Sequence, residues 1–145
     1  MIAESRSRKL QMPSMTMHRN AERKLHREDG PAREHPDGTK EWCLNGQRHR
    51  EDGPAVEWPD GTKEWWLNGR RHRKDGPALE RSDGRKAWYL NGRLHREDGP
   101  AIEWLDGRED SCSWWLDGKY YTFEQWIKIT DLKDSEKAEL ILVYG

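Results

Sequence analysis

The phrase HREDGPA at residues 49–55 decides the fold of this chain, because it recurs. It opens at His26, His49, His72 and His95, each 23 residues after the last, and the third copy reads HRKDGPA. Two turn signals accompany it, Asp-Gly from Asp37, Asp60, Asp83 and Asp106, and Asn-Gly from Asn45, Asn68 and Asn91, with Asp117-Gly118 in the last unit. The chain is therefore a tandem repeat of four units, residues 25–47, 48–70, 71–93 and 94–119, the last lengthened by three residues within 108–113.

The composition excludes a thick hydrophobic core. Of the 145 residues 32% are hydrophobic and 37% are charged, and the mean hydropathy is -1.25. A disordered chain is poor in aromatic residues, whereas this one holds nine Trp, four Tyr and one Phe. These totals predict a thin, elongated fold that uses a few large apolar groups.

Each unit has the pattern of a β-hairpin. Asn-Gly and Asp-Gly favour two-residue turns with positive φ, and the stretches between them alternate polar and apolar residues. A two-residue turn at Asp60-Gly61 would place Val56 opposite Trp65 and point Glu64 to the other face. Since a lone hairpin is marginal in water, we expect a mainly β fold: an elongated single-layer antiparallel sheet of four stacked hairpins with a small C-terminal helical cap.

Stacking the units in register predicts three rows of equivalent side chains. The expected rows are Trp42, Trp65, Trp88 and Trp115; Leu44, Leu67, Leu90 and Leu116; and Val56, Leu79 and Ile102, with Arg33 in the first unit.

The two ends differ from the repeats. Residues 1–24 are basic and aperiodic, and we interpret them as a flexible arm or an N-cap. In residues 120–145 Thr122 and Gln125 have capping-box spacing, and a second helix is expected from about Asp134 with Ala138, Ile141 and Leu142 as its apolar stripe. This C-terminal piece is expected to cover the open end of the sheet, the alternative being a docking face.

Charge, cysteines and hydropathy exclude other classes. With 26 basic and 27 acidic side chains the formal net charge is -1, which argues against a polybasic nucleic-acid binder. Cys43 and Cys112 fit neither a metal spacing nor a disulfide framework. No apolar run could span a membrane, and no secretory signal is visible, so we expect a cytoplasmic protein without membrane attachment.

The recurring His and Asp residues invite a metal or catalytic interpretation, but a structural one is simpler. One set of groups repeated along a line lacks the asymmetry of an active site. We expect each carboxylate to accept backbone N–H bonds in its turn and each imidazole to bond to the next hairpin, with no catalytic residue, metal or cofactor. These structural residues are His26, His49, His72 and His95 with Asp29, Asp52, Asp75 and Asp98.

Adjacent aromatic residues should point to opposite faces, so one row is expected to form an exposed strip rimmed by charge. Trp, Tyr and Arg are frequent at the centre of protein interfaces, and the irregular loop of the fourth unit is a candidate for specificity. The candidate partner-binding residues are Trp66, Tyr89, Trp115, Arg73, Arg108, Glu109, Asp110 and Trp126.

The repeat resembles the MORN family, whose units have the same length and phrases of the type W-x-N-G-K-R-H-G and P-D-G. The matching residues are 66–72 (WLNGRRH) and 59–61 (PDG), and the resemblance covers about residues 25–119. Arg50 or Arg73 stands where the family has a glycine after His, so the chain looks like a divergent MORN-like protein with HREDGPA repeats, a type found in phages and giant viruses. The resemblance implies an interaction platform and supplies no catalytic residues.

We therefore expect a non-enzymatic protein-binding module of unknown oligomeric state. The resemblance implies a viral inhibitor, located in the host cytoplasm, that occludes a functional site of a host or defence enzyme. The alternative is a nucleic-acid or glycan binder that uses the Trp, Tyr and Arg strip for stacking. Binding that collapses with rising salt would favour nucleic acid.

Overall fold

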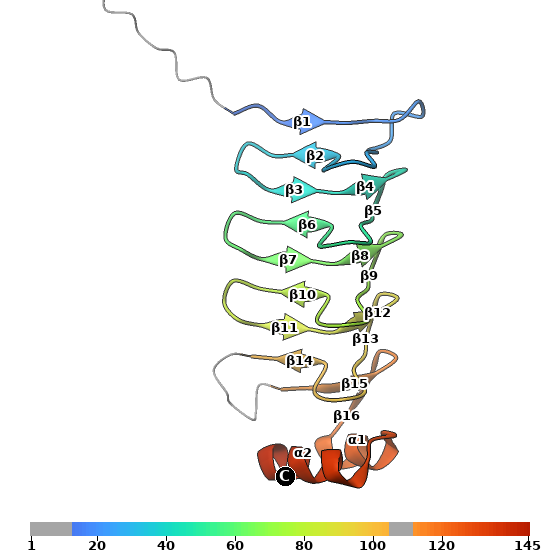
Figure 1. The fold of residues 1–145 in the computed structure, drawn as a ribbon, viewed down its shortest axis with the longest axis vertical. Helices are drawn as coiled ribbons and strands as arrows, with labels where there is room; N and C mark the ends of the chain where they lie inside the picture. Colours follow the sequence, from blue (N-terminus) through green and yellow to red (C-terminus); the bar gives the residue numbers. More distant parts are fainter. Residues whose placement is uncertain (1–12, 105–111) are drawn as a thin grey trace, which may run out of the picture.

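The computed structural model describes residues 13–104 and 112–145 as a stack of repeats ending in two helices (Figure 1). An eight-stranded antiparallel sheet runs along the stack in the order β1-β2-β3-β6-β7-β10-β11-β14, and four two-stranded hairpins stand beside it. The sheet strands are β1 Thr16–Met17, β2 Arg33–Glu34, β3 Lys40–Glu41, β6 Val56–Glu57, β7 Lys63–Glu64, β10 Leu79–Glu80, β11 Lys86–Ala87 and β14 Ile102–Glu103. The hairpin strands are β4 Cys43–Leu44, β5 Gln47–Arg48, β8 Trp66–Leu67, β9 Arg70–Arg71, β12 Tyr89–Leu90, β13 Arg93–Leu94, β15 Trp114–Leu116 and β16 Lys119–Tyr121. The expected mainly β fold with a helical C-terminal end is confirmed.

The Asn-Gly turns have the expected geometry. Asn68 and Gly69 have φ values of +48° and +75°, and they join β8 to β9 with Leu67 opposite Arg70. A two-residue turn with positive φ at both positions matches the right-handed twist of the flanking strands, and Asn and Gly adopt it at low cost.

The Asp-Gly turn is longer than expected, which corrects the predicted register. The Trp58 N–H donates to Thr62 O and the Gly61 N–H to Trp58 O, both at 3.0 Å, so the loop has three residues with Gly61 at φ +89°. Asp60 closes it by accepting the Thr62 N–H at 2.8 Å. Val56 therefore faces Glu64, not Trp65, and Glu64 is buried on Val56's side of the sheet.

The expected tryptophan row also needs one correction. The Ala101 N–H donates to Ser113 O as the Ala55 N–H donates to Glu64 O, so the residue after Ser113 is equivalent to Trp65. Trp114, not Trp115, continues the row of Trp42, Trp65 and Trp88, because the three extra residues of the last unit precede this position.

An additional half-unit, which the sequence pattern did not reveal, precedes the first repeat. β1 pairs with β2, and Arg19 forms an isolated bridge with Leu25. The His18 N–H donates to Ala32 O and the His26 N–H to His18 O, as Trp42 and His49 do one unit later. Of the predicted arm or N-cap, residues 13–24 thus continue the array, and residues 1–12 lie outside the described part.

Helix α1 (Phe123–Ile129) covers the last repeat. Thr122 and Gln125 form the expected capping box. Trp126 is fully buried, its ring lies 4.6 Å from that of Trp114, and its indole N–H donates to Arg96 O at 3.2 Å. The helix therefore closes the stack with an aromatic cluster.

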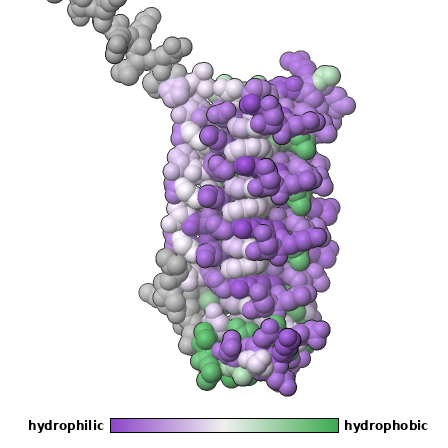
Figure 2. All heavy atoms as spheres, in the orientation of Figure 1, coloured by the Kyte–Doolittle hydropathy of each residue, from purple (hydrophilic) through white to green (hydrophobic). Residues whose placement is uncertain are grey.

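Helix α2 (Asp134–Tyr144) does not bury its predicted stripe. Leu142 is 87% exposed and Ile141 is 49% exposed. By contrast, the ring of Tyr144 packs against that of Trp114, with the two ring centroids 5.1 Å apart. In Figure 2 hydrophilic residues cover most of the visible face and the hydrophobic colour gathers over the helical end.

We expect Trp126→Ala to destabilise the cap by about 3–5 kcal/mol, because it empties a buried ring site and removes the bond to Arg96 O. Amide hydrogen exchange should speed up in residues 112–145 far more than in the first two repeats, since a stacked array transmits stability mainly between neighbours. Ile129→Ala, at a half-exposed position of the same helix, is the control. A uniform loss of protection along the whole chain would contradict local capping.

Candidate binding surface

Three similar hollows follow one another along one side of the array, which we call the turn face because the HR(E/K)D turns at residues 26–29, 49–52, 72–75 and 95–98 project from it. Each hollow lies between two consecutive turns and is floored by a Trp and a Leu from the intervening strands. Hollow 1 contains Trp42, Leu44 and His49; hollow 2 contains Trp65, Leu67 and His72; hollow 3 contains Trp88, Leu90 and His95. Their volumes are about 510, 620 and 660 Å³ respectively.

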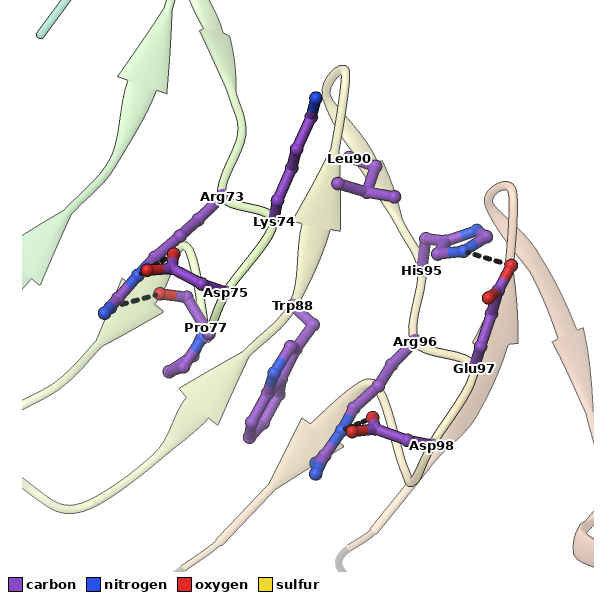
Figure 3. A pocket seen from close by; sticks show the side chains of 11 residues that line it. Arg73, Lys74, Asp75, Pro77, Trp88, Leu90, His95, Arg96, Glu97 and Asp98 are labelled. Carbon is purple, nitrogen blue, oxygen red and sulfur yellow. Dashed lines mark hydrogen bonds and ion pairs between the residues drawn. The ribbon is translucent and has the colours of Figure 1, made fainter. Parts of the chain in front are cut away.

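The arginine of each turn forms the rigid wall of a hollow. In hollow 3 the Arg96 guanidinium lies 3.9 Å from the centroid of the Trp88 ring and donates to Asp98 at 2.7 Å (Figure 3). It also donates to Pro100 O at 3.1 Å and to Glu103, on the adjacent sheet strand. Arg50 and Arg73 lie in the same way over Trp42 and Trp65, 4.2 and 4.0 Å from the ring centroids. Each also donates to the Asp of its turn, to a proline carbonyl oxygen and to a Glu of the sheet.

The position of this arginine explains why each turn has a glycine, because the guanidinium occupies the space that a side chain would need. A Cβ built on Gly76 would lie 3.0 Å from the guanidinium carbon of Arg73, and one on Gly99 would lie 2.8 Å from that of Arg96. A side chain at these positions would push the guanidinium away from its acceptors.

The Asp residues of the phrase pair with arginine side chains, and this is a different partner from the backbone N–H groups expected. Asp29, Asp52, Asp75 and Asp98 accept from Nε of the arginine two residues earlier, at 2.8, 2.9, 3.2 and 2.7 Å. The hydrogen bonds from Arg27 and Arg50 hold the pKa of Asp29 and Asp52 below the ordinary value.

The His residues bond to the next hairpin, as expected. Nδ1 of His26, His49 and His72 accepts the backbone N–H of Asn45, Asn68 and Asn91 at 3.1–3.2 Å, and Nδ1 of His95 accepts that of Asp117 at 3.1 Å. Each imidazole thereby forms a junction between the start of its unit and the hairpin turn near the end of the same unit.

Removing one imidazole should weaken one junction of the array. We expect His72→Ala to cost about 1 kcal/mol of unfolding free energy, because the Asn91 N–H loses its acceptor. Amide exchange at Asn91 should accelerate more than at Asn45, measured by NMR. Lys74→Ala, an exposed side chain of the same turn, is the control; an equal change at both amides would argue against a local junction.

The glutamates of the turns are exposed charges of the turn face that pair with no arginine among the described residues. The side chains of Glu28, Glu51 and Glu97 are 84, 84 and 78% exposed, and each lies 3.4–3.7 Å from the His two residues earlier. The third turn has Lys74 at this position. Hollow 1 is therefore bordered by four carboxylates, Glu28, Asp29, Glu51 and Asp52, against two guanidinium groups.

The other side of the array, which we call the stack face, carries Arg48, Trp66, Arg71 and Tyr89. The guanidinium groups of Arg48 and Arg71 lie 5.2 and 5.1 Å from the Trp66 centroid, and Arg71 lies 5.6 Å from that of Tyr89. The buried Glu64 fixes two side chains of the stack face, because it accepts from Trp66 Nε1 at 2.6 Å and from Arg71 Nη2 at 2.8 Å. The rings of the stack face are therefore engaged in cation–π contacts.

Glu41 occupies the position of Glu64 one repeat earlier and is also buried. It accepts from His35 at 2.7 Å and from Arg48 at 3.3 Å, and Arg33 lies 3.4 Å away. Burial acts to raise the pKa of Glu41, but these partners outweigh it, and the pKa lies below the ordinary value. The ionised carboxylate is the form that stabilises the fold.

Glu41→Gln should lower the unfolding free energy at neutral pH by about 1–3 kcal/mol. Since the folded pKa is depressed, the wild-type advantage is fully present above the unfolded pKa of about 4.3 and is lost as the pH falls through the folded pKa. Melting temperatures of the two proteins should therefore converge in acid. A constant gap at every pH would contradict an ionic origin, and the exposed Glu139→Gln is the control.

The structure separates the predicted partner-binding residues. Trp66 and Tyr89 lie in the stack face, and Trp115 forms an edge contact with Tyr120 at 5.5 Å. Arg73 lies on the turn face, where it covers Trp65 and bonds to Glu80. Trp126 is fully buried in the cap, so it offers no surface to a partner. Arg108, Glu109 and Asp110 lie outside the described residues.

The hollows themselves were missed by sequence reasoning, which placed Trp42, Trp65 and Trp88 in one row and did not bring the polar turns beside them. The available signal was the coincidence of two 23-residue periods, that of the polar turns and that of the Trp-x-Leu pairs. Register across the sheet was needed to bring these two rows together.

Within residues 13–104 and 112–145 no three His, Cys, Asp or Glu side chains are grouped to hold a metal ion. No helix in the same part of the chain is long and apolar enough to cross a bilayer. Compared with known proteins, the chain matches no family model, no curated protein and no solved structure.

Proposed function

We propose that this chain is a non-enzymatic binding platform that holds a protein partner on its turn face. The observation that supports the proposal is the succession of three hollows with equivalent walls, floors and arginine supports. A surface that presents one set of contacts several times in a line is suited to an elongated partner, because each repeat adds a similar increment of binding.

The chemistry of the hollows favours recognition over catalysis. Their Arg side chains already donate to Asp, Glu and backbone oxygens, and their imidazoles accept backbone N–H bonds. The groups left exposed are carboxylates, Lys74 and parts of Trp and Leu, which supply ion pairs and apolar contact. Trp at the floor and charge at the rim is a common arrangement in protein interfaces.

The nucleic-acid and glycan alternative relied on stacking at the Trp, Tyr and Arg strip. Arg48 and Arg71 already cover Trp66, and Arg48 donates to the buried Glu41 while Arg71 donates to the buried Glu64. A base or sugar would have to displace them, which lowers the expected gain from stacking. The protein-binding proposal is therefore preferred.

We further propose that the platform acts by occlusion, since its arginine supports hold the turns in place without a ligand. The resemblance to MORN arrays, which serve as scaffolds, supports an interaction role. A viral origin and a defence enzyme as target belong to the same hypothesis and rest on the resemblance alone.

The proposal is tested by affinity capture from nuclease-treated bacterial lysate with a turn-face variant, Glu28→Gln/Glu51→Gln/Glu97→Gln. The matched control is Glu22→Gln/Asp131→Asn/Glu139→Gln, which removes three exposed carboxylates elsewhere. We expect one stoichiometric protein to be retained by the wild type and the control and reduced at least about fivefold with the turn-face variant. Equal capture by all three would refute the turn face, and recovery of nucleic acid alone from untreated lysate would favour the alternative.

A further inference from the structure

The spacing of the hollows restricts the conformation of a linear partner. Each repeat contributes two strands to the sheet, for example β6 and β7, and neighbouring strands lie about 4.8 Å apart. Successive hollows are therefore separated by about 9.6 Å. Figure 1 shows the repeats stacked with their strands in the same orientation, so the hollows form a nearly straight row.

Among regular backbone conformations, one presents side chains toward a single surface at this interval. A polyproline II helix rises about 3.1 Å per residue with three residues per turn, so every third side chain points the same way about 9.3 Å further on. In a β-strand residues three apart point to opposite faces. Two turns of an α-helix advance about 10.8 Å, about 1.2 Å more than the spacing of the hollows. Over the two intervals between three hollows this mismatch grows to about 2.4 Å.

The lining of the hollows suits a proline-rich chain. Each floor offers a partly exposed Trp ring beside a Leu. One guanidinium lies over each of these rings, whereas two lie over Trp66. Hollows 2 and 3 also include Pro54 and Pro77 from their turns. Aromatic-lined grooves are the usual docking surface for polyproline II segments, whose preformed conformation limits the entropy lost on binding.

Charge distinguishes the two ends of the row. Hollow 1 is bordered by Glu28 and Glu51, whereas Lys74 takes the corresponding place between hollows 2 and 3. A cation of the partner is therefore best accommodated at hollow 1, whose rim carries two glutamates that pair with no arginine among the described residues. Hollow 3 has one such glutamate, Glu97, together with Lys74.

We infer that the turn face binds a proline-rich segment in the polyproline II conformation, with an apolar residue at every third position for hollows 2 and 3 and a basic residue for hollow 1. This inference rests on the proposed function and specifies its partner class. Three hollows span about 19 Å, which such a segment covers in about six residues.

The test uses the full-length protein and three fluorescent peptides of about twelve residues, with binding followed by anisotropy. The first has proline at every third position and an arginine pair at one end. The second has the same composition with the prolines spaced alternately by two and four residues, and the third replaces the arginine pair by glutamate. We expect the first to bind about tenfold more tightly than either of the others, because they lose hollow contacts or the cation site.

Single substitutions on the rim provide a gain and a loss of affinity. Lys74→Glu makes the third turn identical to the others and should strengthen binding of the first peptide about threefold, whereas Glu51→Gln should weaken it about threefold. Both side chains are exposed, so the fold should tolerate the changes, and Glu139→Gln on α2 should leave the affinity unchanged.

The possible outcomes separate this inference from the broader proposal. Equal affinity for the first two peptides, binding of none, or no effect of Lys74→Glu would overturn the polyproline partner. If affinity capture still depended on the turn-face carboxylates, the protein-binding platform would stand with a different partner class. If capture were also insensitive to them, both proposals would fail.

Discussion

One guanidinium in each of the last three units links the parts of this thin protein. Arg96 lies over Trp88, closes its own turn through Asp98 and Pro100 O, and reaches Glu103 of the neighbouring sheet strand. Arg50 and Arg73 make the equivalent contacts. Because five N–H donors are arranged in a rigid plane, an arginine can satisfy several acceptors while its face covers an aromatic ring. The turn, the sheet and the tryptophan row are thereby held in a fixed relation.

This arrangement explains how a chain with so few apolar residues folds. The fully buried positions are mainly small, such as Ala55 and Ala78, and much of the large apolar surface is covered by guanidinium groups and not by other hydrophobic side chains. On the stack face a buried carboxylate fixes the aromatic and basic side chains, since Glu64 accepts hydrogen bonds from Trp66 and Arg71. Charged side chains that are paired and hydrogen-bonded thus take the place of a second layer. On the turn face the three hollows lie between these guanidinium supports.

Local signals predicted the parts of the fold that depend on neighbours in the chain. The Asn-Gly turns follow from the tolerance of Asn68 and Gly69 for positive φ, and the capping box follows from the spacing of Thr122 and Gln125. The Asp-Gly register was missed because the Asp60 carboxylate closes a three-residue loop, which moves Glu64 to the buried face. The half-unit before the first repeat was missed because His18 stands where the repeats have Trp, so the phrase is absent although the hydrogen bonds are retained.

The amino-acid sequence by itself determined the repeat length, the hairpin character of each unit and the helical end, since these depend on turn residues and on short-range periodicity. Tertiary structure alone decided which side chains share a face. It placed Arg73 and Trp66 on opposite sides, buried Trp126 in the cap, and brought two turns and an intervening Trp-x-Leu strand around each hollow. The physical reason is that a shift of one residue in the pairing of two strands exchanges the faces of every side chain beyond it, and that register is set by contacts across the sheet.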